Sequence, residues 1–209
     1  MAETKLKGQV VHTTGNLPLM HTKAPDFRLV DQNLSEHTLR EFHGKRKLLS
    51  TVPSLDTGVC STMTKHINEF AKKHPNFVFI IVSADLPFAQ KRFCESEGVR
   101  GVITLSMMRD KEFGKAYGIL LQDGPLAGIL ARSLFVLDEK DQISYVELVE
   151  EITQEDGSVA KQLKKGRDYK WSFDAERVLQ VDLVGFTIAE KDALKILADD
   201  LFPNKVTIT

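Results

Sequence analysis

The hydrophobic positions of this 209-residue chain alternate between short continuous runs and segments with helical spacing. The continuous runs, which have strand length and many β-branched or aromatic residues, predict core strands at 47–52, 77–82 and 102–105. A run without polar interruption, such as 77–82, is typical of a parallel strand covered on both faces. Apolar residues at helical intervals predict helices at 58–73 and 85–97, the second capped by Asp85.

The flanking segments complete an α/β pattern. Extended pieces are predicted as a small hairpin over 4–12 and a strand that begins near 24–29. A third helix is predicted over 110–117, where Gly118 ends it. A strand hairpin is predicted from two further runs, 133–137 and 142–149. Because strands and helices alternate before this last hairpin, the sequence predicts an α/β domain whose central strands are parallel.

The C-terminal part of the chain has a looser pattern. We predict a main domain over 1–165 and a C-terminal extension over 166–209. The extension contains a strand-like stretch at 178–184 and a helix that starts at the capping box Thr187-Ile188-Ala189-Glu190 and continues through Leu201. A segment of this size is too small for a core of its own. We therefore expect it to pack on the main domain or on a partner subunit.

Charge and composition give no support for several kinds of partner. The formal net charge of −1 and the isoelectric point near 6.6 give no electrostatic reason to expect nucleic acid or an anionic membrane as partner. No stretch approaches the apolar length of about 20 residues that a membrane-spanning helix needs. The first residues lack the apolar core of a secretory signal, so a cytoplasmic location is the expectation.

The segment Pro53-Ser54-Leu55-Asp56-Thr57-Gly58-Val59-Cys60 carries the most specific chemical signal. It joins the strand 47–52 to the helix 58–73, so Cys60 falls in the first turn of that helix. The first N–H groups of a helix lack internal partners and carry the positive end of its dipole. A thiol placed there is stabilised as thiolate, the form that attacks electrophiles. We therefore predict that Cys60 is a nucleophile.

The second cysteine, Cys94, falls on the helix 85–97. Two unrelated buried thiols are the commoner arrangement inside cells, and a structural disulfide is disfavoured without a secretory signal. The two thiols have no CxxC spacing, and the chain has no pair of histidines at ligand spacing, so neither a metal nor another cofactor is expected. Redox pairing of Cys60 with Cys94 is the remaining interpretation, and the loop before Cys60 favours it.

A thiolate at Cys60 needs more positive charge than its helix supplies, since a helix dipole contributes at most about 2 kcal/mol. A buried arginine suits this need because it stays charged and donates several hydrogen bonds. Arg132, just before a predicted strand, is a candidate, although spacing does not choose it over other basic residues. The Thr57 hydroxyl either caps the helix or bonds an oxygen that approaches the sulfur. Pro53 and Gly58 suit a stiff, tight turn.

Three groups of residues carry a resemblance to a known family. Together with some weaker matches they extend over 24–153. They are 53–60, then Ser83-Ala84-Asp85-Leu86-Pro87-Phe88-Ala89-Gln90 with Arg92-Phe93-Cys94, and Asp123-Gly124-Pro125-Leu126 with Ala131-Arg132. Weaker support comes from 24–27, 102–106 and 148–153. Together these motifs resemble the thiol peroxidases of the peroxiredoxin superfamily, the atypical two-cysteine kind with a thioredoxin-like fold.

The resemblance implies a role for each candidate site residue. Cys60 matches the peroxidatic cysteine and Cys94 the resolving cysteine, which join in an intramolecular disulfide. Pro53, Thr57 and Arg132 match the residues of the peroxide pocket. A family member reduces hydrogen peroxide and organic hydroperoxides to water and alcohols, is recycled by thioredoxin and forms homodimers. Because a disulfide needs Cα atoms about 4.4–6.8 Å apart, we expect the first turn around Cys60, the helix around Cys94, or both, to unwind between steps.

Two features depart from the family pattern. Ser50 and Thr51 are more polar than the family's strand before this loop, and the chain continues well past the segment that the family's closing helix follows.

Three other functions compete with the peroxidase. A redox relay or holdase would form stable mixed disulfides, and a thiol–disulfide oxidoreductase would need a CxxC pair, which the chain lacks. A cysteine hydrolase would need a histidine, but His66 is turned away from Cys60 on the same helix.

Overall fold

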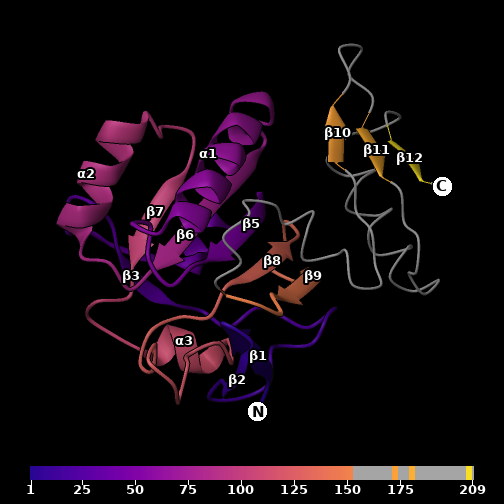
Figure 1. The fold of residues 1–209 in the computed structure, drawn as a ribbon. Helices are drawn as coiled ribbons and strands as arrows, with labels where there is room; N and C mark the ends of the chain where they lie inside the picture. Colours follow the sequence, from indigo (N-terminus) through magenta and orange to yellow (C-terminus); the bar gives the residue numbers. More distant parts are fainter. Residues whose placement is uncertain (153–170, 174–178, 182–205, 209) are drawn as a thin grey trace. The chain divides into compact units, whose positions relative to one another are not determined.

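The computed structural model describes residues 1–152, 171–173, 179–181 and 206–208. The chain divides into two compact units, Met1–Glu155 and Asp156–Thr209. The first unit contains a seven-stranded sheet in the order β4-β3-β7-β6-β5-β8-β9 (Figure 1). The strands are β3 (Arg28–Val30), β4 (Glu36–Thr38), β5 (Arg46–Thr51), β6 (Phe77–Ser83), β7 (Ile103–Ser106), β8 (Ser133–Leu137) and β9 (Ile143–Leu148). The helices are the 3-10 helix η1 (Leu39–Phe42), α1 (Gly58–Lys73), α2 (Pro87–Glu97) and α3 (Glu112–Ala116).

The centre of this sheet consists of parallel strands. β5 pairs in parallel with β6, and β6 with β7, so α1 and α2 are the two crossover connections. β8 pairs antiparallel with β5 and forms the predicted hairpin with β9. The α/β architecture predicted from the sequence, with its parallel central strands, is therefore confirmed. The C-terminal ends of β5 and β6 lie side by side, and each leads into a helix that carries one of the two cysteines.

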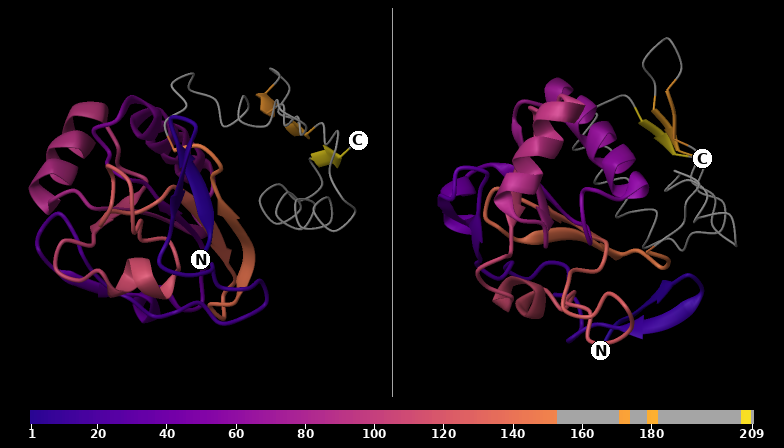
Figure 2. Two further views of the ribbon diagram at one scale, coloured as in Figure 1. Left: turned by 60° about the horizontal axis from the view of Figure 1, so that its bottom comes forward. Right: turned by 60° about the vertical axis from the view of Figure 1, so that its left-hand side comes forward.

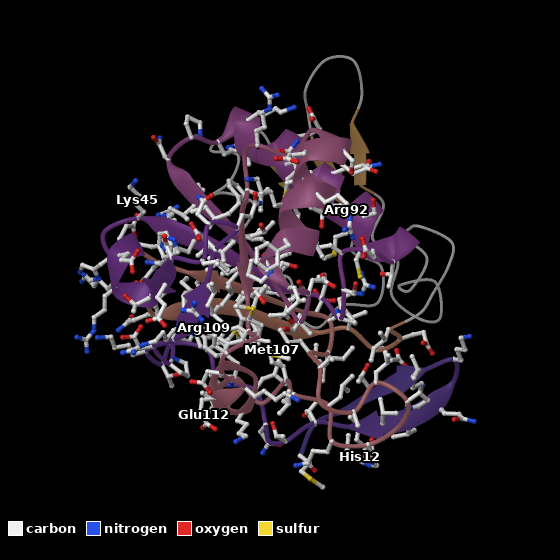
Figure 3. All side chains as sticks on the ribbon, turned by 90° about the vertical axis from the view of Figure 1, so that its left-hand side faces the viewer. His12, Lys45, Arg92, Met107, Arg109 and Glu112 are labelled. Atoms are coloured by element: carbon white, nitrogen blue, oxygen red, sulfur yellow. The ribbon has the colours of Figure 1, made fainter. Side chains whose placement is uncertain are left out.

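Both faces of the sheet are covered, which explains the unbroken apolar run of β6. Phe79 and Ile81 belong to the buried cluster that contains Cys60 and Cys94. Their neighbours along the strand belong to a second cluster, with Phe113 and Tyr117 of the α3 region. Successive residues of a strand point to opposite faces, so β6 serves both clusters. Figure 3 shows the sheet between α2, marked by Arg92, and α3, marked by Glu112.

The helix starts differ in one respect from the prediction. α1 has the predicted bounds, but Asp85 does not cap α2, so that prediction is wrong. Leu86 is the N-cap residue, and Pro87 is the first residue of the helix, where its missing N–H costs nothing. Gly98 ends α2 with a left-handed φ of 66°. The Asp85 carboxylate makes other bonds, described with the site.

The N-terminal hairpin, β1 (Glu3–Leu6) and β2 (Gln9–His12), lies beside the chain that follows β9 (Figure 2). Lys5 N–H donates to Glu150 O at 2.7 Å, and Ile152 N–H donates to Lys5 O at 2.8 Å. The Thr4 hydroxyl donates to Val149 O at 2.7 Å. The segment 149–152 is therefore fixed by backbone pairing to the hairpin that the sequence predicted.

The second unit contains a small three-stranded sheet. β10 (Trp171–Phe173) pairs antiparallel with β11 (Leu179–Val181), which pairs in parallel with β12 (Val206–Ile208). β11 confirms residues 179–181 of the strand predicted at 178–184. The predicted boundary at 165/166 and the helix predicted from Thr187 to Leu201 lie outside the described residues and stay predictions. No helix in the described ranges has both the length and the apolar character to cross a membrane.

A buried ion pair stands near the start of β5. Lys47 is fully buried, and its Nζ donates to Asp141 Oδ1 at 2.5 Å. His43 Nδ1 lies 2.8 Å from the other oxygen of the same carboxylate. Burial by itself raises the pKa of Asp141, but the bonds and charges of Lys47 and His43 outweigh it, and the pKa falls below its usual value. This stabilisation is therefore present above the unfolded pKa, about 3.9, and is lost as the pH falls through the folded value.

Substituting Lys47 by methionine is expected to lower the free energy of unfolding at pH 7 by about 3–5 kcal/mol, because the Asp141 charge stays buried without its main partner. Urea denaturation followed by circular dichroism measures the change. Adding Asp141→Asn removes the stranded charge and tolerates the local φ of 65°, so the double variant should recover much of the loss. Lys45→Met, at an exposed position, is the control; equal effects of Lys47→Met and Lys45→Met would contradict the prediction.

Candidate active site

Cys60 and Arg132, 72 residues apart in sequence, are in direct contact. Cys60 is the third residue of α1, and its side chain is fully buried. Arg132, which is 4% exposed and precedes β8, donates from Nη2 to Cys60 Sγ at 3.2 Å. The same nitrogen donates to Ile152 O at 3.1 Å, and Nη1 lies 4.0 Å from Met63 Sδ. The fold thus places next to this thiol the cation that the sequence analysis required.

The backbone around Arg132 is held by Thr51 of β5 and by Val149, the residue after β9. Thr51 Oγ1 donates to Ala131 O at 2.7 Å and lies 2.6 Å from Ser133 Oγ. Val149 N–H donates to Arg132 O at 3.0 Å. Thr51, whose polarity departs from the family pattern, therefore fixes the two residues that flank Arg132. The sequence interpretation assigned it no such use, because nothing local reveals which strand it faces.

One buried nitrogen of the Arg132 guanidinium group makes no hydrogen bond within the described part of the chain. This nitrogen is Nε, whose N–H is a hydrogen-bond donor. Buried polar groups in native proteins nearly always have a partner, since an unpaired one costs about 1–3 kcal/mol. A buried donor without an acceptor, on a guanidinium that contacts a thiol, is suited to an oxygen-bearing ligand.

The loop before Cys60 places the other two pocket candidates differently. Pro53 is buried, whereas Thr57 is exposed. Thr57 occupies the N-cap position of α1 in an extended conformation, but its hydroxyl does not cap the helix and donates to Ser54 O at 3.3 Å. Of the two uses predicted for this hydroxyl, capping is therefore not observed, and contact with a ligand oxygen stays a prediction.

Asp85, which the sequence analysis assigned to a helix cap, instead fastens this loop. Its Oδ1 accepts a bond from Ser54 Oγ at 2.7 Å, and its Oδ2 accepts one from Leu55 N–H at 2.7 Å. Ser83 Oγ also donates to Oδ2 at 2.8 Å. The sequence signal was the 83–90 motif, in which the polar Ser83 ends a buried strand and the acidic Asp85 follows it.

Cys94 lies on α2 with 6% exposure, in the same hydrophobic cluster as Cys60. Both are free thiols. Cys94 Sγ is 3.9 Å from Thr104 Oγ1, which also accepts a bond from Gln32 Nε2 at 2.8 Å. Burial raises the pKa of the Cys94 thiol, and the hydrogen bonds from Thr104 and Gln32 only partly oppose it. Cys94 is therefore held as a protonated thiol in an apolar setting.

Among the described side chains, no group of three or more His, Cys, Asp or Glu residues is placed to hold a metal ion. The side chain of His66 lies outside the description. The groups that the described residues place around Cys60 Sγ include the Arg132 guanidinium and the start of α1.

The fold and the site together define a thioredoxin-like protein of the peroxiredoxin class. The fold has a sheet with parallel central strands, and the site has a thiol in the first turn of a crossover helix with a buried arginine on its sulfur. The family model described as Redoxin matches residues 20–163. A thiol peroxidase of Leptospira interrogans is 47% identical over 157 residues, which is 74% of this chain and 92% of that protein. The chain therefore belongs to the thiol peroxidases of the peroxiredoxin (Redoxin) family.

Solved structures agree with this assignment. A peroxiredoxin-like protein from Aquifex aeolicus has a TM-score of 0.70 and 40% identity, over 74% of this chain and 90% of that one. A thiol peroxidase from Chromobacterium violaceum has a TM-score of 0.68 over 78% of this chain and 95% of that one; at 22% identity it shows the fold alone. The thioredoxin-like fold implied by the sequence resemblance is thus confirmed.

Proposed function

We propose that this protein reduces hydrogen peroxide and organic hydroperoxides to water and alcohols, with Cys60 as the peroxidatic and Cys94 as the resolving cysteine. The observation that carries the proposal is the contact of 3.2 Å between Arg132 Nη2 and Cys60 Sγ at the start of α1. The guanidinium and the helix start both bring positive charge to the sulfur, and such charge stabilises a thiolate. Among the described side chains, the group that donates to Sγ is a guanidinium and not an imidazole, which favours the peroxidase over a cysteine hydrolase.

In the first step the Cys60 thiolate attacks one oxygen of the hydroperoxide. The S–O bond forms as the O–O bond breaks, and the second oxygen leaves with the bonding pair and takes a proton as water or alcohol. The sulfur is oxidised to sulfenic acid and the peroxide is reduced. The free Nε–H of Arg132 and the first N–H groups of α1 stabilise negative charge on the oxygens as the bond breaks. We assign the Thr57 hydroxyl to the same pocket, with Pro53 as its buried wall.

In the second step the Cys94 thiol condenses with the Cys60 sulfenic acid. An S–S bond forms and water leaves, which gives an intramolecular disulfide. A dithiol reductant, which we propose is thioredoxin, then returns both cysteines to thiols and becomes a disulfide itself. Because the two thiols belong to different helices, we propose that the first turn of α1, helix α2, or both, unwind locally before the bond forms. A homodimer and a cytoplasmic location complete the proposal, on the resemblance alone.

The proposed reaction is tested by following NADPH oxidation with thioredoxin reductase, thioredoxin and the full-length protein. Hydrogen peroxide and cumene hydroperoxide should each be consumed with one NADPH per peroxide. Peptide mapping after one equivalent of peroxide should find Cys60 joined to Cys94 within one chain. If neither thioredoxin nor dithiothreitol supports consumption, the peroxidase proposal fails. If only dithiothreitol does, the choice of thioredoxin alone is wrong.

A further inference from the structure

The loop before Cys60 is fastened to the end of β6 by one carboxylate. Asp85 accepts bonds from the hydroxyl of Ser54 and the backbone N–H of Leu55, the first two residues after Pro53. Because Leu55 is itself 1% exposed, its N–H is satisfied by this carboxylate and not by bulk water. Releasing Asp85 would leave a buried donor unpaired, so the loop is stable in this position only while the carboxylate holds it.

The same carboxylate is connected to helix α2 through Ser83. Ser83 Oγ donates to Asp85 Oδ2 at 2.8 Å and accepts a bond from Gln90 Nε2 at 2.9 Å. Gln90 Nε2 also donates to Leu105 O on β7 at 2.9 Å. Gln90 and Ser83 are fully buried. Gln90 lies one helical turn before Cys94, so both side chains belong to the buried face of α2.

At α2, this chain of hydrogen bonds ends in Gln90, whose side-chain amide is only partly hydrogen-bonded. Gln90 Oε1 is buried and has no partner among the described residues. An unpaired buried amide oxygen offsets part of what the two Nε2 bonds contribute. The attachment of α2 at Gln90 is therefore specific in geometry but modest in strength, which suits an element that must be released once in every catalytic cycle.

We propose that Asp85, Ser83 and Gln90 form a latch that makes the closed Cys60 loop and the folded α2 helix depend on each other. The proposal rests on the peroxidase function proposed above and adds to it two positioning residues, Asp85 and Gln90, joined by Ser83. With the latch closed, Cys60 is set for attack on peroxide and Cys94 is withheld in the core. Opening the Gln90 end frees the helix that carries Cys94 and loosens the loop that precedes Cys60.

The latch predicts opposite effects on the two chemical steps. Asp85→Ala is expected to slow peroxide attack by Cys60 about tenfold, which corresponds to about 1.4 kcal/mol. Gln90→Leu, which keeps the shape but removes both donors, is expected to speed formation of the Cys60–Cys94 disulfide about tenfold. A residue that merely stabilises the fold would slow both steps or neither. Rapid-quench measurements of peroxide loss and of thiol loss in one turnover separate the two rates.

A conservative replacement of Asp85 tests whether the rate of peroxide attack can be restored. In Asp85→Asn the amide oxygen can accept from Leu55 N–H and Ser83 Oγ, while the amide nitrogen can donate to Ser54 Oγ, so this variant should keep most of the wild-type rate of attack. Asp85→Asn as slow as Asp85→Ala would show that the charge, and not the set of bonds, is what matters, and would overturn the latch in this form.

Hydrogen exchange of the reduced protein, without peroxide, tests the coupling directly. Gln90→Leu should raise exchange about tenfold both in α2 and in the distant loop 53–57. Glu95→Gly, an exposed position on α2 away from the latch, should raise exchange in α2 only. In a Ser83→Ala background the two halves are disconnected, so adding Gln90→Leu should no longer affect the loop.

The outcomes separate the latch from the proposed function. If the wild type consumes no peroxide, the peroxidase proposal fails while the exchange comparison still decides the coupling. If the wild type is active but Gln90→Leu leaves loop exchange unchanged, the latch alone is wrong. The latch is equally wrong if Glu95→Gly loosens the loop as much as Gln90→Leu does.

Discussion

Replacing Cys60 by serine is expected to reduce peroxide consumption to the uncatalysed background, because the hydroxyl that results is far less nucleophilic than a thiolate. Cys94→Ser should keep the first reduction at the wild-type rate and lose turnover with thioredoxin. Single-turnover assays should find one peroxide consumed per Cys94→Ser chain, with a sulfenic acid at Cys60 that a dimedone probe captures. With excess peroxide the same sulfur should advance to the sulfinic acid, since no second thiol intercepts it.

The two variants control each other, since each removes one buried sulfur from the same hydrophobic cluster. Similar unfolding midpoints for both would show that the kinetic difference is chemical. Loss of the first reduction in Cys94→Ser as well as in Cys60→Ser would contradict the division of roles. Full thioredoxin-supported turnover by Cys94→Ser would show that another thiol, from a second chain or from the reductant, resolves the sulfenic acid.

Elements with a strong local pattern could be predicted from the sequence. The bounds of α1 follow from its apolar spacing, and the unbroken apolar run of β6 correctly indicated a parallel strand with both faces covered. Asp85 shows where this reasoning stops. An acidic residue just after a strand suits a helix cap and a loop clasp equally well, and its partners, Ser54 and Leu55, lie about thirty positions away. The residues around Asp85 in the sequence do not indicate a hydrogen bond to partners so far away in the chain.

In the candidate site, too, local sequence predicts some features, whereas others depend on residues that are distant in the chain. That Cys60 stands in the first turn of a helix follows from local pattern, and so does the need for a cation. The choice of Arg132 came only from the family resemblance, because 72 residues separate it from the sulfur that it contacts. Thr51 looked like an imperfection in a core strand, and only the pairing of β5 with β8 explains it, by placing Thr51 opposite Ser133.

Arg132→Met is expected to slow peroxide attack by about 10²–10³-fold, the usual effect of removing a donor that stabilises transition-state charge. Methionine keeps much of the buried stem, so the packing around the sulfur changes little. The rate is best measured as single-turnover peroxide loss in the Cys94→Ser background, where resolution does not interfere. Because the variant also leaves Ile152 O without its described donor, circular dichroism and the unfolding midpoint must accompany the rate.

Arg132→Lys separates charge from geometry at this position. Lysine keeps the positive charge, but its ammonium cannot reproduce a planar fork that bonds the Cys60 sulfur and keeps a further donor, Nε–H, free for an oxygen. We therefore expect Arg132→Lys to recover only part of the rate that Arg132→Met loses. Full recovery would mean that positive charge alone suffices, and the free Nε–H would then have no part in catalysis. An Arg132→Met rate within about threefold of the parent, far short of the loss expected for a transition-state donor, would remove the guanidinium from the mechanism and leave the helix start as the only activating group at Cys60.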